Sequence, residues 1–167
     1  MREIAYNLGP YHLERLGFEK SIRDMATRVA KSSGVAISTE LEALDGALSS
    51  ETQMSLYRVA QEALNNMVKH SRAPETRIAL KRESAGVRLT VTDNGRGFDP
   101  QAAKASEVPG GARPGFGLNA MAERLRLLGG ALTIRSAPEH GTTVEAFLPD
   151  PDGKRKRKGE NDGTKKS

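Results

Sequence analysis

Apolar residues follow two periods along this chain, and these periods predict helices and strands. In three long segments apolar residues recur three and four positions apart, which is typical of a helix with one buried face. In five shorter segments apolar and polar residues alternate, as in strands with one buried face. The predicted helices are Phe18–Ser32, Ser50–Ser71 and Phe116–Leu128, and the predicted strands are Val35–Leu41, Thr76–Arg82, Val87–Thr92, Ala131–Ser136 and Thr143–Leu148. This mixture predicts the α/β class.

The most informative polar sequence follows the predicted strand Val87–Thr92. It reads Asp-Asn-Gly-Arg-Gly-Phe from Asp93 to Phe98. A carboxylate at a strand end can accept a hydrogen bond from the exocyclic amine of a purine, and glycines let a base approach the backbone closely. A tight turn rich in Asp, Asn and Gly has the same composition. The stretch therefore indicates either a purine site or a plain turn, and the flanking elements must decide between them.

One face of the predicted helix Ser50–Ser71 gathers four polar groups. Glu62, Asn66, Lys69 and His70 stand at positions i, i+4, i+7 and i+8, which fall on one arc of an α-helix. An Asn oxygen is a hard ligand that suits Mg²⁺, and a Lys one turn away can meet phosphate. The alternative is an ordinary amphipathic helix with a solvated polar face.

Glycines precede the third predicted helix. Gly115 and Gly117 flank Phe116, and Leu118 begins the apolar spacing. Free backbone N–H groups at such a helix start can hold phosphate, helped by the helix dipole. The loose dinucleotide pattern G-x-G-x-x-A also fits, but a polar loop stands where that motif needs a buried strand. These glycines therefore favour phosphate contact over a dinucleotide fold.

In their order and spacing, these motifs resemble those of the GHKL, or Bergerat-type, ATP-binding domain. Gln61–His70 is similar to the N box of that family, and Asp93–Phe98 is similar to its first glycine box. Gly115–Leu118 resembles the second glycine box, and the turn Gly141–Thr143 resembles the last. Within that family, the motifs are most similar to those of bacterial two-component sensor histidine kinases, in the class paired with LuxR-type response regulators. The resemblance covers residues 1–149, and it implies a two-layer α/β sandwich in which a mixed, mainly antiparallel sheet packs on three helices.

The resemblance implies a role for each motif residue. Asp93 would accept a hydrogen bond from the adenine amine of ATP, and Asn66 would coordinate Mg²⁺. Lys69 and His70 would meet phosphate oxygens, and Glu62 would orient a water on Mg²⁺ or act as a general base. Glu62 and Asn66 are therefore the expected catalytic residues. The remaining expected nucleotide contacts are Gly95, Gly97, Phe98, Gly115, Gly117, Leu118, Thr142 and Thr143.

The resemblance also divides the chain and implies its partners. Residues 1–17 are similar to the end of a dimerisation hairpin and its connector, residues 18–149 to the catalytic domain, and residues 150–167 form a basic tail. The γ-phosphoryl group would go to a His on the hairpin and then to an Asp of a response regulator. The family's phosphoacceptor His precedes an acidic residue, whereas His12 precedes Leu13. The phosphoacceptor is therefore expected outside this chain, in a full-length protein that is a homodimer.

Composition indicates the cellular compartment and argues against some kinds of partner. The chain of 167 residues has no Cys, which suits a reducing cytoplasm, and no apolar run as long as a membrane span. Membrane contact would then come only through a sensor region elsewhere. The absence of Trp and the low aromatic content, 4%, argue against a surface that stacks nucleic-acid bases. Of the net charge of +5, +3 lies in residues 150–167, which are expected to be disordered. The Gly/Pro-rich loop 99–114 is predicted to be a mobile lid over the triphosphate.

Two other functions are compatible with the same nucleotide fold. The first is an anti-sigma-factor kinase, which phosphorylates a Ser on a partner. That class lacks a dimerisation hairpin, so the segment Ile4–Gly17 argues against it. The second is a non-catalytic nucleotide-binding module, against which the four intact motifs argue.

Overall fold

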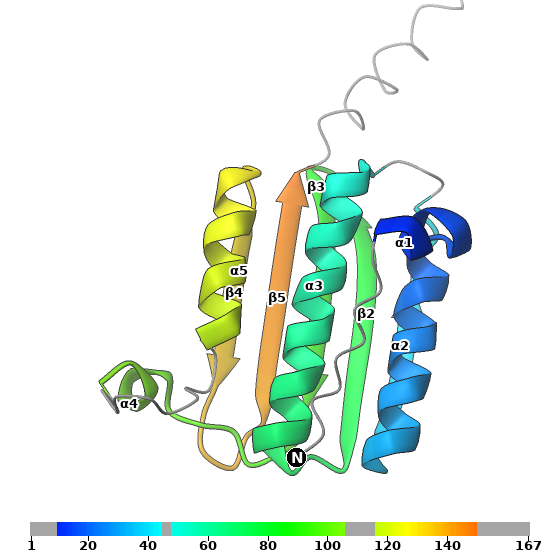
Figure 1. The fold of residues 1–167 in the computed structure, drawn as a ribbon. Helices are drawn as coiled ribbons and strands as arrows, with labels where there is room; N and C mark the ends of the chain where they lie inside the picture. The colour runs from blue at the N-terminus through cyan, green and yellow to red at the C-terminus, as the bar shows by residue number, and fades with distance from the viewer. Residues whose placement is uncertain (1–9, 45–47, 106–115, 150–167) are drawn as a thin grey trace, which may run out of the picture.

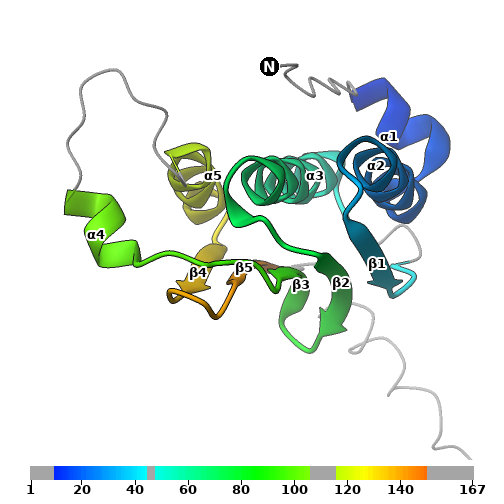
Figure 2. The same ribbon diagram turned by 90° about the horizontal axis from the view of Figure 1, so that it is seen from below.

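The protein forms two layers, a five-stranded sheet and a set of helices that cover one face of it (Figures 1 and 2). The structure is a computed structural model that describes residues 10–44, 48–105 and 116–149. The strands are β1 (Ala36–Leu41), β2 (Glu75–Glu83), β3 (Gly86–Asp93), β4 (Ala131–Ser136) and β5 (Thr142–Pro149). The helical segments are α1 (Pro10–Leu16), α2 (Phe18–Ser33), α3 (Ser50–Asn66), η1 (Met67–Ser71), α4 (Pro100–Ala105) and α5 (Phe116–Leu127).

The strand order is β1-β2-β3-β5-β4. β1 and β2 are parallel and the other pairs are antiparallel. Parallel neighbours need a long crossover connection, and α3 supplies it between β1 and β2. A two-residue turn suffices between β2 and β3, where Glu83 pairs with Gly86. The prediction of a mixed, mainly antiparallel sheet in an α/β sandwich is confirmed.

The main helices begin and end at recognisable capping residues. The side chain of Ser49 accepts a hydrogen bond from the backbone N–H of Thr52, at 3.1 Å, and so caps the start of α3. Gly34 takes a left-handed conformation, with φ of 76°, and ends α2. The helical period located α2, α3 and α5 to within a few residues, apart from the last turn after α3.

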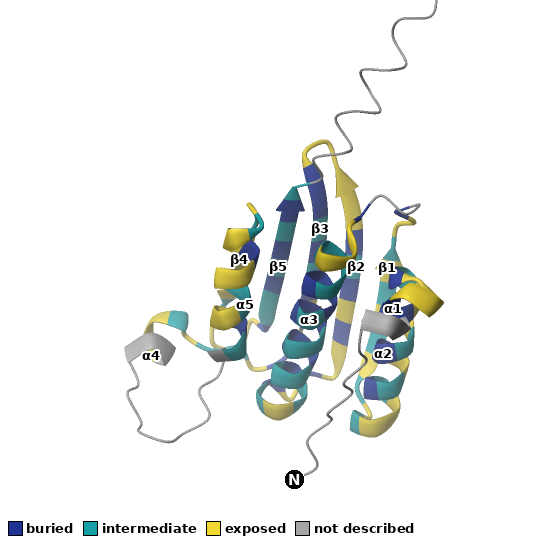
Figure 3. Cartoon of the chain, turned by 45° about the horizontal axis from the view of Figure 1, so that its top comes forward, coloured by how far each residue is buried: buried dark blue, intermediate teal, exposed yellow. Residues whose placement is uncertain are grey.

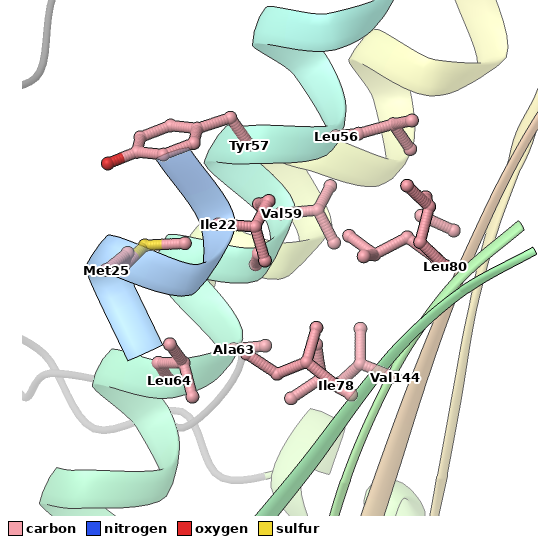
Figure 4. Close-up of a cluster of buried hydrophobic side chains, with 14 of the residues drawn as sticks. Ile22, Met25, Leu56, Tyr57, Val59, Ala63, Leu64, Ile78, Leu80 and Val144 are labelled. Carbon is pink, nitrogen blue, oxygen red and sulfur yellow. The ribbon is translucent and has the colours of Figure 1, made fainter. Parts of the chain in front are cut away.

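The core lies between the helices and the inner face of the sheet (Figures 3 and 4). Figure 4 shows side chains of α2 and α3, among them Ile22 and Leu56, directed toward Ile78 and Leu80 of the sheet layer. The alternating apolar positions of the predicted strands should form this core, and those that are buried are Ile78, Leu80, Val87, Leu89, Val91, Val144 and Ala146. Leu132 and Ile134 are only partly buried, because β4 is an edge strand.

The ends and the loop 99–114 agree with the sequence only in part. α1 lies within the segment predicted to be a hairpin end, and its Leu13 is buried in the core. The predicted lid 99–114 contains the short helix α4. Residues 106–114 of the lid lie outside the described residues, as do residues 1–9 and the basic tail 150–167. None of the helices in the described part of the chain is both long and apolar enough to cross a bilayer.

Candidate functional site

A cavity of about 90 Å³ opens where the end of α3 meets the end of β3 and the start of α5. Its walls are largely apolar, and its polar groups come from the motifs that the sequence singled out. The lining residues are Ala63, Asn66, Met67, His70, Ser71, Val91, Asp93, Arg96, Gly97, Phe98, Leu118, Thr142 and Val144. Residues of all four motifs, which are far apart in the sequence, therefore meet in one cavity.

The last turn after α3 is wider than an α-helix, and this changes which side chains reach the cavity. Residues Met67–Ser71 form the π-helical turn η1, whereas the sequence predicted a continuous α-helix to Ser71. His70 and Ser71 line the cavity, while Lys69 is exposed and does not. The helical wheel placed Lys69 on one arc with Asn66 and His70, but only His70 joins Asn66 at the cavity, because the wheel assumed 3.6 residues per turn throughout.

Asp93 is the buried carboxylate of the cavity, with 8% of its surface exposed. Its Oδ1 accepts two hydrogen bonds, from the Ser71 hydroxyl at 2.5 Å and from the Gly95 backbone N–H at 2.8 Å. Within the described residues, its other oxygen accepts no hydrogen bond from a side chain or a loop amide. One oxygen is thus held by the protein, and the other is left to accept a hydrogen bond from a ligand.

The two glycines after Asp93 are required by contacts within the protein. A Cβ on Gly95 would lie 2.3 Å from the Ser71 carbonyl oxygen, and a Cβ on Gly97 would lie 2.0 Å from that of Ala137. Gly97 also has a φ of +60°, in the region that favours glycine. The sequence explained these glycines by the approach of a base, but the structure shows that backbone approaches them instead. Gly95 lies behind Asp93, outside the cavity lining, while Gly97 is part of it.

Side chains on β4 and β5 support the loop on its other side. The Ser136 hydroxyl accepts a hydrogen bond from the Phe98 backbone N–H at 2.9 Å and lies 2.9 Å from Thr142 Oγ1. Thr142 lines the cavity. The next side chain, Thr143, lies on the opposite face of the sheet, where its hydroxyl is 3.3 Å from that of Thr92. The expectation that Thr143 contacts nucleotide through its side chain is therefore wrong, because alternate strand residues face opposite ways.

The start of α5 meets α3 through Glu62. A Cβ on Gly117 would lie 2.2 Å from Glu62 Oε1, so the carboxylate rests directly against this glycine. Leu118 is buried and lines the cavity, whereas Glu62 and Gly117 stand beside it. Gly115 lies outside the described residues. This arrangement puts a negative charge at the first turn of α5, where the helix dipole favours it.

The other polar groups of the cavity are basic or amide. Burial, together with the nearby charges of Lys69 and Arg96, lowers the pKa of His70 below its usual 6.5, so its imidazole is neutral at pH 7. The Arg96 guanidinium donates a hydrogen bond to the His70 carbonyl oxygen at 2.6 Å. Asn66 lines the cavity with a buried side-chain nitrogen that has no hydrogen-bond partner in the described residues. The cavity thus combines a carboxylate with amide and basic groups.

Three residues that sequence reasoning missed take part in this geometry: Ser71, Arg96 and Ser136. Arg96 lies within the motif Asp93–Phe98, but the sequence analysis assigned roles only to other residues of that motif. Ser71 was assigned only as the end of a helix, and nothing in the local sequence signals a π-helical turn. Ser136 was assigned only as a strand end, and its role depends on a contact with Phe98, which is 38 positions away.

The sequence matches a known protein family over most of its length. Residues 51–152 match the family described as histidine kinase-, DNA gyrase B-, and HSP90-like ATPase. The chain belongs to this ATPase family. This confirms the assignment of the four motifs to a GHKL-type ATP-binding domain.

Among curated relatives of this ATPase-family chain are two sensor histidine kinases. MctS of Rhizobium johnstonii is 34% identical over 149 residues, and LiaS of Bacillus subtilis is 32% identical over 149 residues. The alignments cover 89% of this chain but only 31% and 39% of those relatives. The chain therefore spans about a third of the length of these proteins.

A solved structure shows the same ATPase-family fold. The histidine kinase domain of a blue-light activated kinase from Erythrobacter litoralis superposes with a TM-score of 0.67 at 18% identity. The match covers 87% of this chain and 72% of that one. The sheet order and helix layer described above are therefore those of the histidine kinase domain.

Proposed function

We propose that this chain is the ATP-binding catalytic domain of a sensor histidine kinase. It would supply the γ-phosphoryl group of ATP to a His on a dimerisation hairpin, for relay to an Asp of a response regulator. The observation that carries the proposal is the cavity in which Asp93, held by Ser71 and Gly95, offers one free carboxylate oxygen between apolar walls. The names of the relatives favour a histidine kinase over a Ser kinase or a non-catalytic module.

The base of ATP would lie at the carboxylate end of the cavity. The exocyclic amine of adenine would donate to the free oxygen of Asp93. Val91, Leu118 and Val144 supply apolar surface beside it, and removing a planar base from water against such walls stabilises the complex. Phe98 and Gly97 would close this end of the site.

Asn66 would hold Mg²⁺ through its side-chain oxygen. The described residues contain no group of three or more His, Cys, Asp or Glu side chains suited to a metal. This fits Mg²⁺, which commonly takes one or two protein ligands and completes its shell with phosphate oxygens and water. The side-chain nitrogen of Asn66 is buried without a hydrogen-bond partner in the described residues, so the protein does not hold the amide through that atom. Bound there, Mg²⁺ would neutralise charge on the phosphates.

The other polar groups would position the phosphates. Lys69 and His70 would meet phosphate oxygens, with Lys69 reaching in from the exposed side of η1. The backbone N–H groups of Gly115, Gly117 and Leu118 would cradle the β- and γ-phosphates. Phosphoryl transfer depends mainly on such positioning and on charge stabilisation. Glu62 would orient a water or act as a general base, which requires its carboxylate to leave Gly117.

The wider organisation is also a proposal. Residues 1–17 would be the end of the dimerisation hairpin, residues 18–149 the catalytic domain and residues 150–167 a basic tail. The full-length protein would be a cytoplasmic or membrane-anchored homodimer paired with a LuxR-type regulator, without direct nucleic-acid contact. Because His12 is followed by Leu13 and no acidic residue, this chain alone would not phosphorylate itself.

The decisive experiment is calorimetric titration of Mg²⁺–ATP and Mg²⁺–ADP into the protein, with Asp93→Asn alongside. Binding by the wild type and loss of binding by the variant are expected. A separately made dimerisation hairpin should then acquire acid-labile phosphate, as expected for phosphohistidine. Retained binding by Asp93→Asn would overturn the adenine assignment, and acid-stable phosphate would favour a Ser kinase.

A further inference from the structure

We infer that Ser71 is the positioning residue that sets the nucleotide specificity of the cavity, by fixing which oxygen of Asp93 faces the ligand. The inference rests on the proposed ATP site and adds to it a residue outside the motif positions assigned to nucleotide contact. Ser71 is 7% exposed and lies in η1, so the widened turn is what brings it to the cavity.

The contacts of Ser71 tie the end of α3 to the loop after β3. Its hydroxyl donates to Asp93 Oδ1 at 2.5 Å, and its carbonyl oxygen accepts the Arg96 backbone N–H at 2.8 Å. The Gly95 backbone N–H completes the two donors on the same carboxylate oxygen. Because both donors occupy Oδ1, the carboxylate cannot turn without breaking a hydrogen bond to a charged group.

Among the described residues, no other hydroxyl near Asp93 donates a hydrogen bond to its carboxylate. Thr76 stands directly opposite Asp93 on β2 and is 3% exposed, but its hydroxyl has no hydrogen-bond partner there. Thr142 stands opposite Asp93 on β5, and its hydroxyl pairs with Ser136. Ser71 is therefore the side chain, among the described residues, that orients the carboxylate.

The chemistry of the bases turns this orientation into specificity. Adenine presents an amine donor at the position where guanine presents a carbonyl oxygen. A carboxylate oxygen held toward that position attracts the first and repels the second. A carboxylate that is free to rotate can move away from guanine, so it would discriminate less.

The test is calorimetric titration of ATP and GTP, each with Mg²⁺, into the wild type and Ser71→Ala. The affinity for ATP should fall about tenfold, the lower end of what a hydrogen bond to a charged group contributes. The affinity for GTP should change less than about threefold, so that the preference for ATP shrinks. Equal losses for ATP and GTP would show a merely structural role and would overturn the inference, as would no change in either.

Two further variants bracket this result. Ser71→Thr keeps the hydroxyl donor and should keep the preference for ATP, which also covers the case in which Ser71→Ala does not fold. Ser55→Ala is the matched control, because Ser55 is a buried serine of the same helical segment whose hydroxyl has no partner in the described residues. It should leave both affinities unchanged, and loss of the preference in Ser55→Ala or Ser71→Thr would contradict the proposed role.

A readout without nucleotide separates this inference from the proposed function. The Gly95 backbone N–H should exchange with solvent about tenfold faster in Ser71→Ala, because its carboxylate acceptor is no longer held in place. If the wild type binds neither nucleotide, the proposed function fails, while the exchange rate still decides whether Ser71 positions Asp93. An unchanged exchange rate would overturn the positioning role itself.

Discussion

The two ends of the cavity are built differently. At the carboxylate end, formed by Ser71, Asp93 and the loop 94–98, backbone lies against backbone and two donors hold one carboxylate oxygen. At the α5 end, Leu118 lines the cavity, and beside it the tip of the long Glu62 side chain rests against Gly117. Glycine occurs at both ends. Backbone atoms lie against the glycines of the first end, whereas a side chain that can move lies against the glycine of the second.

This difference suggests that the two ends of the cavity have different functions. The end that would recognise the base is fixed before any ligand binds, so it can discriminate between bases at little entropic cost. The end that would receive the phosphates can rearrange, as a site for a group that is transferred and released must. Each prediction below tests one side of this contrast.

Gly97→Ala should have the largest effect. The new Cβ would lie 2.0 Å from the Ala137 carbonyl oxygen at a φ of +60°, so the backbone of the loop must shift. We expect a loss of at least about 3 kcal/mol of stability, or roughly 6–12 °C in Tm, measured by calorimetry. Gly34→Ala is the control, since it has a φ of +76° with nothing within 4 Å, and it should lose only about 1 kcal/mol. Equal losses for both would show that the close backbone approach is unimportant.

Truncating the ligand should separate the two ends. Asp93→Asn should weaken adenosine and ATP alike, by about 100-fold, because both carry the amine that its carboxylate would accept. Asn66→Ala should weaken Mg²⁺–ATP by about tenfold or more and leave adenosine unchanged, since adenosine has no phosphate to bridge. Calorimetric titration measures all four affinities. An effect of Asn66→Ala on adenosine would contradict the assignment of this residue to the phosphates.

Gly117→Ala should be nearly neutral, in contrast to Gly97→Ala. The three atoms nearest to its Cβ would all belong to the Glu62 side chain, and this flexible side chain can move aside. Ala also favours a helix over Gly by about 1 kcal/mol, so we expect a change within about 1 kcal/mol in urea unfolding. The double variant Glu62→Ala/Gly117→Ala should be more stable than Glu62→Ala alone. A loss as large as that of Gly97→Ala would mean that the α5 end is equally fixed.

A small pH effect should come from His70, between the two ends. Its pKa is lowered by burial first and by Lys69 and Arg96 next, so the unfolded state binds the proton more readily. Its contribution to stability is therefore complete above pH 6.5 and is lost as the pH falls through the lowered folded pKa. Urea unfolding from pH about 7.5 to about 5.5 should show this loss in the wild type and less of it in His70→Gln. Identical profiles for the two proteins would contradict this origin.

The sequence was a good guide to the fold for identifiable reasons. The alternation of Ile78 and Leu80 and of Val87, Leu89 and Val91 follows directly from one buried sheet face, and these residues form the core. Helical spacing likewise found α2, α3 and α5. Both patterns are local consequences of burial, which a single sequence records.

The site was predicted less completely because its details depend on contacts between distant segments. Asp93 and Asn66 were found, since a carboxylate or carboxamide in a motif is visible in the sequence. The reason for Gly95 was missed because the Ser71 backbone that approaches it is 24 positions earlier in the chain. Thr143 was different: the alternation of residues along a strand already placed it on the face opposite Thr142, and the error was avoidable.

The π-helical turn gives the chain an unusual sensitivity to length. A π-helical turn holds one residue more than the α-helical turn that would fill the same place, so the residues before and after it keep their directions while the side chains within it are spread more widely. Removing a single residue from 67–71 would therefore return the turn to the α-helical period and leave the rest of the fold in register. The loss would be local, because the side chains of this turn, those of His70 and Ser71 among them, would no longer be spaced as they are around the cavity. In this turn, therefore, a substitution changes one contact, whereas a deletion changes the spacing of a whole group of side chains.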